Sequence, residues 1–449
     1  MESLSALQQR PMSRMQIRSV MIAIAILILD GFDITVMAFT AAAVSTEWSI
    51  SATGLGLVLS ASLFGMAIGS VFIAPLADRV GRRPVVLVSL LLIMIGMFLT
   101  SMSPSVEWLF AFRVITGLGA GGMISNCVVL VSEYANDRRR SFLTAIQATG
   151  YPLGATLSGV FAGMLIPQVG WRSVFEAGAA LSLVLLVIAF FWLPESLDFM
   201  LSKRRPSHLS AVNRALRSMK LEPLDAMPAW SVDGEAPKRQ GISALLRGDL
   251  LARSVLLWLG YGLLISGYYF INSWTPKIIA ASAGDPQVGV VFGVVVNAGG
   301  ILGVLLFALL VLRFKPAPVL IWVLALTSAA FVGFAVFYHD FAIAITIASL
   351  LGLAATTGIG GFQTVGPQVY APQQRASGVG FMIGFGRILS IVAPILVGAL
   401  LDAGLPPEQI FLIFAAPLAL SAACAFGVHR LMSRAPQPAA ESDPVGSAV

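Results

Sequence analysis

Two carboxylates stand one helical turn apart in the first long apolar stretch of the chain, within Leu29-Asp30-Gly31-Phe32-Asp33. Residues three apart share a face of a helix, so Asp30 and Asp33 can face one cavity. Ionisable groups inside a membrane span are costly and usually serve ion or substrate handling. Solvated acids in a soluble or interfacial segment are the weaker interpretation, because about twelve residues on each side are almost free of charge. We therefore predict that this pair takes part in ion or substrate handling.

Two arginines, Arg113 and Arg387, also fall inside apolar segments. A lone guanidinium at such depth needs a carboxylate or a water-filled cavity, and Asp30 or Asp33 is the natural partner of Arg113. The alternative is a purely structural ion pair. Arg387 has no comparably deep acid in its own half of the chain, so we predict that it binds a substrate carboxylate. The alternative is an ion pair with Asp30 or Asp33 across the two halves.

Aromatic and amide side chains in the same apolar segments provide candidate walls for a substrate site. Rings that could stack on an aromatic substrate are Phe32, Tyr268, Tyr269, Phe270, Trp274, Phe362, Phe381 and Phe385. For any single ring, helix packing is the commoner role, and Trp274 is typical of a membrane-interface residue. Amides that could hydrogen-bond a substrate or bridge helices are Asn126, Gln147, Asn272, Asn297 and Gln363. The selected substrate-site residues are Arg387, Phe32, Asn272, Tyr268, Gln363 and Phe385.

The composition predicts a polytopic α-helical membrane protein that needs no cofactor. The 449 residues are 57% hydrophobic and only 11% charged, with a mean hydropathy of +0.88, whereas soluble domains carry about 25% charged residues. Cys127 and Cys424 fall in apolar segments and need not pair. No histidine, cysteine and carboxylate cluster has metal-ligand spacing. No nucleotide-binding motif is present either, so transport driven by ATP is not supported.

Twelve apolar runs of spanning length form two sets of six. They are expected near 19–43, 53–77, 84–103, 107–132, 141–165 and 171–194, then near 251–275, 287–312, 317–338, 341–366, 376–400 and 408–431. The first run is too long for a signal peptide and carries two central acids, so we expect it to be retained. The predicted organisation is an N-terminal segment (1–18), a six-helix bundle (19–194), a linker (195–250), a second six-helix bundle (251–431) and a tail (432–449).

Basic residues are distributed unevenly between the predicted loops. With both termini inside, the outer loops hold only Arg172 and Lys277 of the 28 Lys and Arg residues. The positive-inside rule therefore places both termini in the cytoplasm and the protein in the cytoplasmic (inner) membrane. The net charge of +6 is a topology signal and does not indicate nucleic-acid binding.

A short turn after the second predicted span carries one acid among several bases, in Asp78-Arg79-Val80-Gly81-Arg82-Arg83. Gly81 permits a tight backbone turn. Asp78 could meet a helix N-terminus or an arginine and hold one face of the protein shut. Glu133, at the inner end of the fourth span, could join this latch. The alternatives are an ordinary basic loop with an incidental acid and a solvated Glu133.

This turn resembles the signature loop of the major facilitator superfamily, G-x-x-x-D-R-x-G-R-R, with Ala74 in place of the first glycine. The run from Arg113 to Gly122 is similar to the R-x-x-x-G-x-G-x-G motif of the same superfamily. More narrowly, Asp30-Gly31-Phe32-Asp33 and Gly384-Phe385-Gly386-Arg387 resemble the aromatic acid:proton symporter family. Leu312 and Lys315 replace the acid and glycine of the second-half loop, which argues against a matching second latch.

The resemblance implies a major facilitator fold and import of an aromatic carboxylate, such as benzoate or a hydroxybenzoate, together with protons. Asp30, Asp33 and Arg113 would couple protons, and Arg387 would hold the substrate, with two six-helix halves giving alternating access. The expected partners are substrate, protons and the lipid bilayer, and we expect a monomer. The alternative is a proton-driven exporter of organic anions or drugs. A sensor or an enzyme is disfavoured, because no output domain or catalytic cluster is present.

Overall fold

The computed structural model describes residues 11–203, 206–219, 221–226 and 245–433, and this part of the chain is helical with no strand. Twelve helices are long and apolar enough to cross a membrane, which confirms the predicted number of spans. The first six long helices are α2 (Arg14–Trp48), α3 (Ala52–Phe72), α5 (Arg82–Ser101), α6 (Val106–Tyr134), α7 (Asp137–Val169) and α8 (Arg172–Trp192). The second six are α12 (Asp249–Ala283), α13 (Pro286–Arg313), α14 (Pro316–Phe337), α15 (Phe341–Val365), α16 (Pro372–Asp402) and α17 (Pro407–Ser433).

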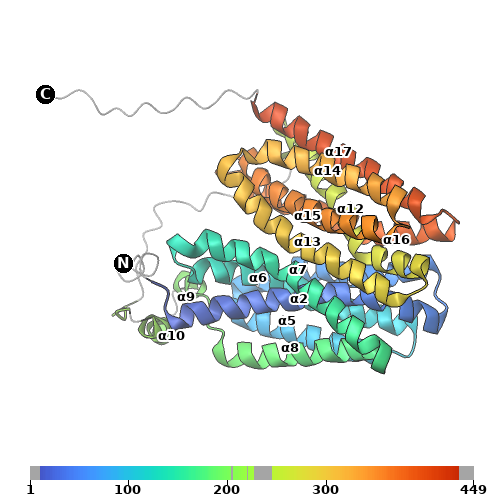
Figure 1. The fold of residues 1–449 in the computed structure, drawn as a ribbon. Helices are drawn as coiled ribbons and strands as arrows, with labels where there is room; N and C mark the ends of the chain where they lie inside the picture. The colour runs from blue at the N-terminus through green and yellow to red at the C-terminus, as the bar shows by residue number, and fades with distance from the viewer. Residues whose placement is uncertain (1–10, 204–205, 220, 227–244, 434–449) are drawn as a thin grey trace.

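The two sets of six form two bundles that lie side by side (Figure 1). Within the N-terminal half, α2 packs on α7, α3 on α6, and α5 on α6 and α8. Within the C-terminal half, α13 packs on α15, α12 on α16 and α17, and α14 on α17. Between the halves the main contacts are α3 with α16 and α7 with α13. Four helices therefore form most of the seam at which the halves can move.

Short elements connect these helices. They are the 3-10 helices η1 (Ala74–Leu76) and η2 (Gly366–Val369) and the helices α4 (Ala77–Val80), α9 (Leu197–Lys203) and α10 (Pro206–Ser218). Helix α10 lies within the predicted linker and buries Val212 and Leu216. Parts of the predicted N-terminal segment, linker and tail, at 1–10, 204–205, 220, 227–244 and 434–449, lie outside the described residues.

Gly31 lets α7 approach the acid-bearing segment of α2. A Cβ atom at Gly31 would overlap the backbone carbonyl oxygen of Tyr151, and one at Gly154 would overlap that of Ile28. A hydrogen bond of 2.7 Å between the hydroxyls of Thr35 and Ser158 joins the same two helices farther along. This close contact fixes α7 beside Asp30.

We call the end of the molecule that carries the start of α2 together with α9 and α10 the linker side (Figure 1). On the opposite side, hydrogen bonds join the two halves. Asp402, at the end of α16, accepts the backbone N–H groups of Ala52 (2.9 Å) and Thr53 (2.8 Å) at the start of α3. The Ser60 hydroxyl donates to the carbonyl of Ile391 at 2.7 Å, and Lys277 Nζ donates to Ser45 Oγ at 3.0 Å. The halves are therefore fastened together on the side opposite the linker.

Replacing Asp402 with alanine is expected to loosen this fastening. The carboxylate caps a helix of the other half, and loss of a helix N-cap costs about 1 kcal/mol, which corresponds to about a fivefold shift in population. We therefore expect Asp402→Ala to raise the alkylation rate of a cysteine at buried Ser60 about fivefold. The measurement uses a membrane-impermeant maleimide added to the side on which α3 begins. Both native cysteines are buried, which keeps the background low.

Asp285→Ala is the matched control for this experiment. Asp285 is also an N-cap on the same side, but it accepts the N–H of Gln287 in its own helix, at 2.8 Å, and does not join the halves. It should leave the alkylation rate of the Ser60→Cys chain unchanged. If the Ser60→Cys protein is alkylated equally fast with and without Asp402→Ala, the contact of Asp402 with α3 does not hold the halves together.

Candidate functional site

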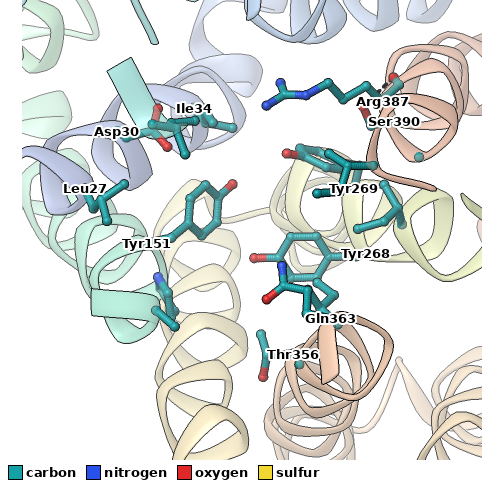
Figure 2. Close-up of a pocket in the computed structure, with 18 of the residues that line it drawn as sticks. Leu27, Asp30, Ile34, Tyr151, Tyr268, Tyr269, Thr356, Gln363, Arg387 and Ser390 are labelled. Carbon is teal, nitrogen blue, oxygen red and sulfur yellow. Dashed lines mark hydrogen bonds between the residues drawn. The ribbon is translucent and has the colours of Figure 1, made fainter. Parts of the chain in front are cut away.

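A cavity of about 410 Å³ lies between the two halves, between their middle and the linker side. Its size suits a small-molecule site, because such sites occupy about 300–1,000 Å³. Its walls are mostly apolar with a few polar groups on each side. Those of the N-terminal half are Asp30, Gln147 and Tyr151, and those of the C-terminal half are Tyr261, Tyr268, Tyr269, Thr356, Gln363, Arg387 and Ser390. Figure 2 shows Asp30 and Tyr151 on one wall, facing Arg387, Tyr268 and Tyr269 on the other.

The expected partner of Arg113 is present, and it is Asp33. Arg113 Nη1 donates to Asp33 Oδ1 at 2.6 Å, and Nη2 donates to the Asp33 backbone carbonyl at 2.7 Å. The exposed fractions of the two side chains are 1% and 0%, and the guanidinium lies 5.6 Å from the ring centre of Phe175. The pair is therefore closed off from the cavity, behind α2.

Asp30 and Asp33 do not share a cavity, which corrects the sequence-based expectation. Residues three apart are offset by about 60° around a helix, and the cavity wall falls between them. Asp30 lines the cavity, whereas Asp33 points toward α6 and Arg113. Asp30 is buried, yet no hydrogen bond or ion pair reaches its carboxylate from the described residues. One acid is thus paired and buried, and the other is unpaired at the cavity.

Arg387 lies on the opposite wall, and its guanidinium extends across the cavity toward Asp30 (Figure 2). No carboxylate among the described residues lies within ion-pair distance of it, so the alternative pairing with Asp30 or Asp33 is not formed. The cavity therefore holds a cation and an acid that face each other with space between them. This arrangement can accept an anion at one wall and a proton at the other.

Tyrosine rings form much of the wall near these charges. Tyr151 of α7 and Tyr268 of α12 belong to different halves, and their ring centres are 6.3 Å apart. Tyr268 and Gln363 line the cavity where the sequence placed them. Tyr151 and Gln147 were not selected as site residues. Their one-turn spacing within the fifth span was the available signal, but nothing in the sequence showed which face of that span meets the other half.

Three residues predicted to contact substrate lie outside the cavity lining. Phe32 packs edge-on against Phe161, with ring centres 5.7 Å apart, because it points into the N-terminal bundle. Asn272 donates to the carbonyl of Tyr268, one turn earlier in α12, at 3.0 Å. Phe385 packs beside Gly262 on the face of α16 that meets α12. None of the three lines this cavity, and their contact with substrate stays a prediction.

Trp274 also differs from expectation, because it is not an interface residue. Its side chain is fully buried, and its indole N–H donates to the carbonyl of Pro394 at 2.9 Å. This bond ties α12 to α16 within the C-terminal half.

On the linker side, Glu195 forms the centre of a polar cluster. One of its oxygens accepts the backbone N–H groups of Arg82 (2.8 Å) and Arg83 (3.2 Å), which begin α5. The Arg82 side chain forms an ion pair with Glu133 and donates to Ser196 Oγ at 2.7 Å, and Ser196 in turn donates to Glu133 at 2.6 Å. The cluster joins the ends of α6 and α8 to the start of α5, all within the N-terminal half.

Asp78, the acid of the predicted latch, takes no part in this cluster, whose acids are Glu133 and Glu195. Asp78 and Arg79 lie in helix α4 and are exposed, and neither forms an ion pair with a described side chain. The chain turns between α4 and α5 at a single residue, Gly81, which has φ 108°. That backbone conformation favours glycine, and a Cβ there would also overlap the Glu195 carboxylate. Glu133 does join a cluster here, but with Arg82 and not with Asp78.

No group of three or more metal-ligating side chains occurs among the described residues. Cys127 and Cys424 are both free and buried, in line with their reading as small apolar residues.

Comparison with known proteins defines the class of this chain. The sequence profile of the Major Facilitator Superfamily matches residues 22–367. The chain therefore belongs to the Major Facilitator Superfamily, and it is a secondary transporter and not an enzyme.

Named relatives cover nearly the whole chain. The 4-hydroxybenzoate transporter PcaK of Pseudomonas aeruginosa is 32% identical over 426 residues, which are 92% of each chain. The gallate transporter of Pseudomonas putida is 28% identical over 430 residues, 93% of each chain.

Solved structures share the fold. A D-xylose-proton symporter matches with a TM-score of 0.72 at 14% identity and covers 91% of this chain and 97% of its own. An inward-facing bacterial homologue of the human lysosomal transporter Spinster matches with a TM-score of 0.71 at 17% identity, over 95% of this chain and 99% of its own.

Proposed function

We propose that this protein imports an aromatic carboxylate together with protons by alternating access. The observation that carries the proposal is the cavity between the halves, where unpaired Arg387 faces unpaired Asp30 across walls rich in tyrosine. Guanidinium binds carboxylates in a planar, two-point geometry, and aromatic rings stack favourably with a benzoate ring. The names of the relatives, which specify 4-hydroxybenzoate and gallate, support this class of substrate.

In this mechanism the substrate carboxylate binds to Arg387, while Tyr268 and Gln363 contact its ring. Asp30 takes up the proton at the cavity. The ion pair of Asp33 and Arg113 holds the α2 segment in place. Movement of this pair changes the electric field at Asp30 and therefore its affinity for a proton. Substrate and proton together neutralise both walls, which lowers the cost of closing the cavity around them.

The orientation and gating follow from the same proposal. We place the protein in the inner membrane as a monomer with both termini in the cytoplasm, so that the linker side is cytoplasmic and the described state faces inward. The cluster of Arg82, Arg83, Gly81, Glu133 and Glu195 would keep the linker-side ends of the N-terminal half together while the halves rock. Asp78 and Arg79 would form their contacts in the opposite, outward-facing state.

The test is uptake into proteoliposomes of labelled benzoate and hydroxybenzoates under an inside-alkaline pH gradient. We expect accumulation of at least one of these acids, and we expect a proton ionophore to abolish it. Uptake that is unaffected by the ionophore would remove proton coupling. If folded protein accumulates none of the acids, aromatic-acid import is wrong. Gradient-driven extrusion from inside-out vesicles would then support the exporter.

A further inference from the structure

The N-terminal wall of the cavity carries polar groups that have no partner. The Gln147 side chain is only 2% exposed, and neither its Nε2 nor its Oε1 atom has a hydrogen-bond partner among the described residues. The hydroxyl of Tyr151, one turn farther along α7, also lacks a described partner in hydrogen-bond geometry, although the hydroxyls of Tyr268 and Tyr269 lie close enough to interact with it. Buried polar atoms are almost always satisfied in folded proteins, so unpaired ones that line a cavity point to a ligand.

Several other polar side chains within the spans are satisfied inside the protein. The amides of Asn126 and Asn297 each donate to a carbonyl one turn earlier in their own helix, at 2.8 and 2.9 Å. Thr35 and Ser158 bond each other between α2 and α7. Among the described residues, unpaired buried polar atoms also occur away from the cavity, at Ser89, Asn272 and Thr275. Those that line the cavity belong to Asp30, Gln147 and Tyr151, all on the N-terminal wall.

These two groups lie opposite the proposed carboxylate site. Residues four apart share one face of a helix, so Gln147 and Tyr151 present one surface to the cavity. Figure 2 shows the Tyr151 ring on the N-terminal wall and Arg387 on the C-terminal wall. A rigid ring whose carboxylate binds Arg387 therefore directs its far edge toward α7.

We propose that Gln147 and Tyr151 recognise a ring hydroxyl remote from the carboxylate and make the transporter selective for hydroxylated aromatic acids. This rests on the proposed function. A phenolic hydroxyl both donates and accepts, and a glutamine amide and a tyrosine hydroxyl can each supply the complementary group. An unsubstituted ring would leave both side chains unpaired when the cavity closes, and sites of this kind discriminate strongly against ligands that lack the hydroxyl.

The test compares uptake of 4-hydroxybenzoate and benzoate in proteoliposomes, as the ratio of their kcat/KM values. The variants are Gln147→Leu and Tyr151→Phe, which remove polar atoms and keep the approximate shape. We expect the native chain to prefer 4-hydroxybenzoate and each variant to lower that preference about tenfold, the size of effect expected for one lost hydrogen bond. Benzoate uptake should stay equal or rise, because the variants also remove the polar groups that benzoate would leave unpaired.

Thr149→Val is the matched control. Thr149 lies between the two residues on α7, outside the cavity lining, and its hydroxyl donates to the carbonyl of Ile146 at 2.6 Å. It should leave the ratio unchanged. A ratio near one in the native chain, or one that Gln147→Leu and Tyr151→Phe leave unaltered while both acids are transported, overturns the inference alone. Native protein that transports neither acid overturns the proposed function and the inference together.

Discussion

Replacing Arg113 with leucine is expected to abolish transport and to destabilise the N-terminal half. Arg113 and Asp33 are almost completely buried and bonded at 2.6 Å, so the change leaves a carboxylate without a partner inside the bundle. Breaking a buried ion pair on one side costs about 3–5 kcal/mol, a large part of the free energy of unfolding of a typical domain. The measurements are uptake in proteoliposomes and the thermal melting temperature of purified protein in detergent.

A second variant separates stability from transport. Asp33→Asn combined with Arg113→Gln removes both charges and leaves groups that can still hydrogen-bond, so we expect it to recover most of the lost melting temperature. Transport should not return if the charged pair takes part in proton coupling. Full recovery of coupled uptake would instead show that the pair serves packing alone, which is the structural alternative.

Arg172→Gln provides the control for loss of an arginine ion pair. Arg172 bonds Glu47 at 2.7 Å at the edge of the bundle, where more than a third of each side chain is exposed. Exposed pairs contribute about 0–1 kcal/mol, so this variant should melt within a few degrees of the native chain. If Arg113→Leu lowered the melting temperature as little as Arg172→Gln does, burial of the ion pair would not make Arg113 important for stability.

The sequence was sufficient for features that depend on runs and periodicity. Each span needs about 20 apolar residues, and each connection needs polar or turn-forming ones, so twelve spans in two sets can be counted directly. The depth of Arg113 in an apolar run likewise required an acid, and the first span offered only two. Choosing Asp33 over Asp30 required the rotation of α2 about its axis, which is set by the close approach of Gly31 to α7.

The features that sequence reasoning missed depend on which helix faces meet. Phe32 and Phe385 are as apolar and as close to charged residues as Tyr268 is, yet they point into their bundles while Tyr268 reaches the cavity. Glu195 follows a span end far along the chain from Arg82, so its bond to the start of α5 becomes visible only once α8 packs on α5. A motif match drew attention to Asp78, whose side chain is exposed in the described state.

Replacing Asp30 with asparagine is expected to separate substrate exchange from proton-driven accumulation. Asparagine keeps the shape of a protonated aspartate, so the neutral wall opposite Arg387 remains available while the group can no longer release a proton. Because every 1.4 kcal/mol is a factor of ten, symport of one proton supports about tenfold accumulation for each pH unit of gradient. Asp30→Asn should lose this accumulation and keep counterflow of labelled against unlabelled substrate within about threefold of the native rate.

This outcome depends on Asp30 being the acid at the cavity and not merely an acid in the span. Asp285→Asn is the control, because Asp285 is an exposed helix cap away from the cavity and should leave both assays unchanged. If Asp30→Asn still accumulates substrate against the gradient, the proton must be carried elsewhere, and the buried Asp33–Arg113 pair becomes the only other acid site in this part of α2 among the described residues. If counterflow is lost as well, Asp30 belongs to the binding of substrate, and the unpaired charges on the two walls act together on the same ligand.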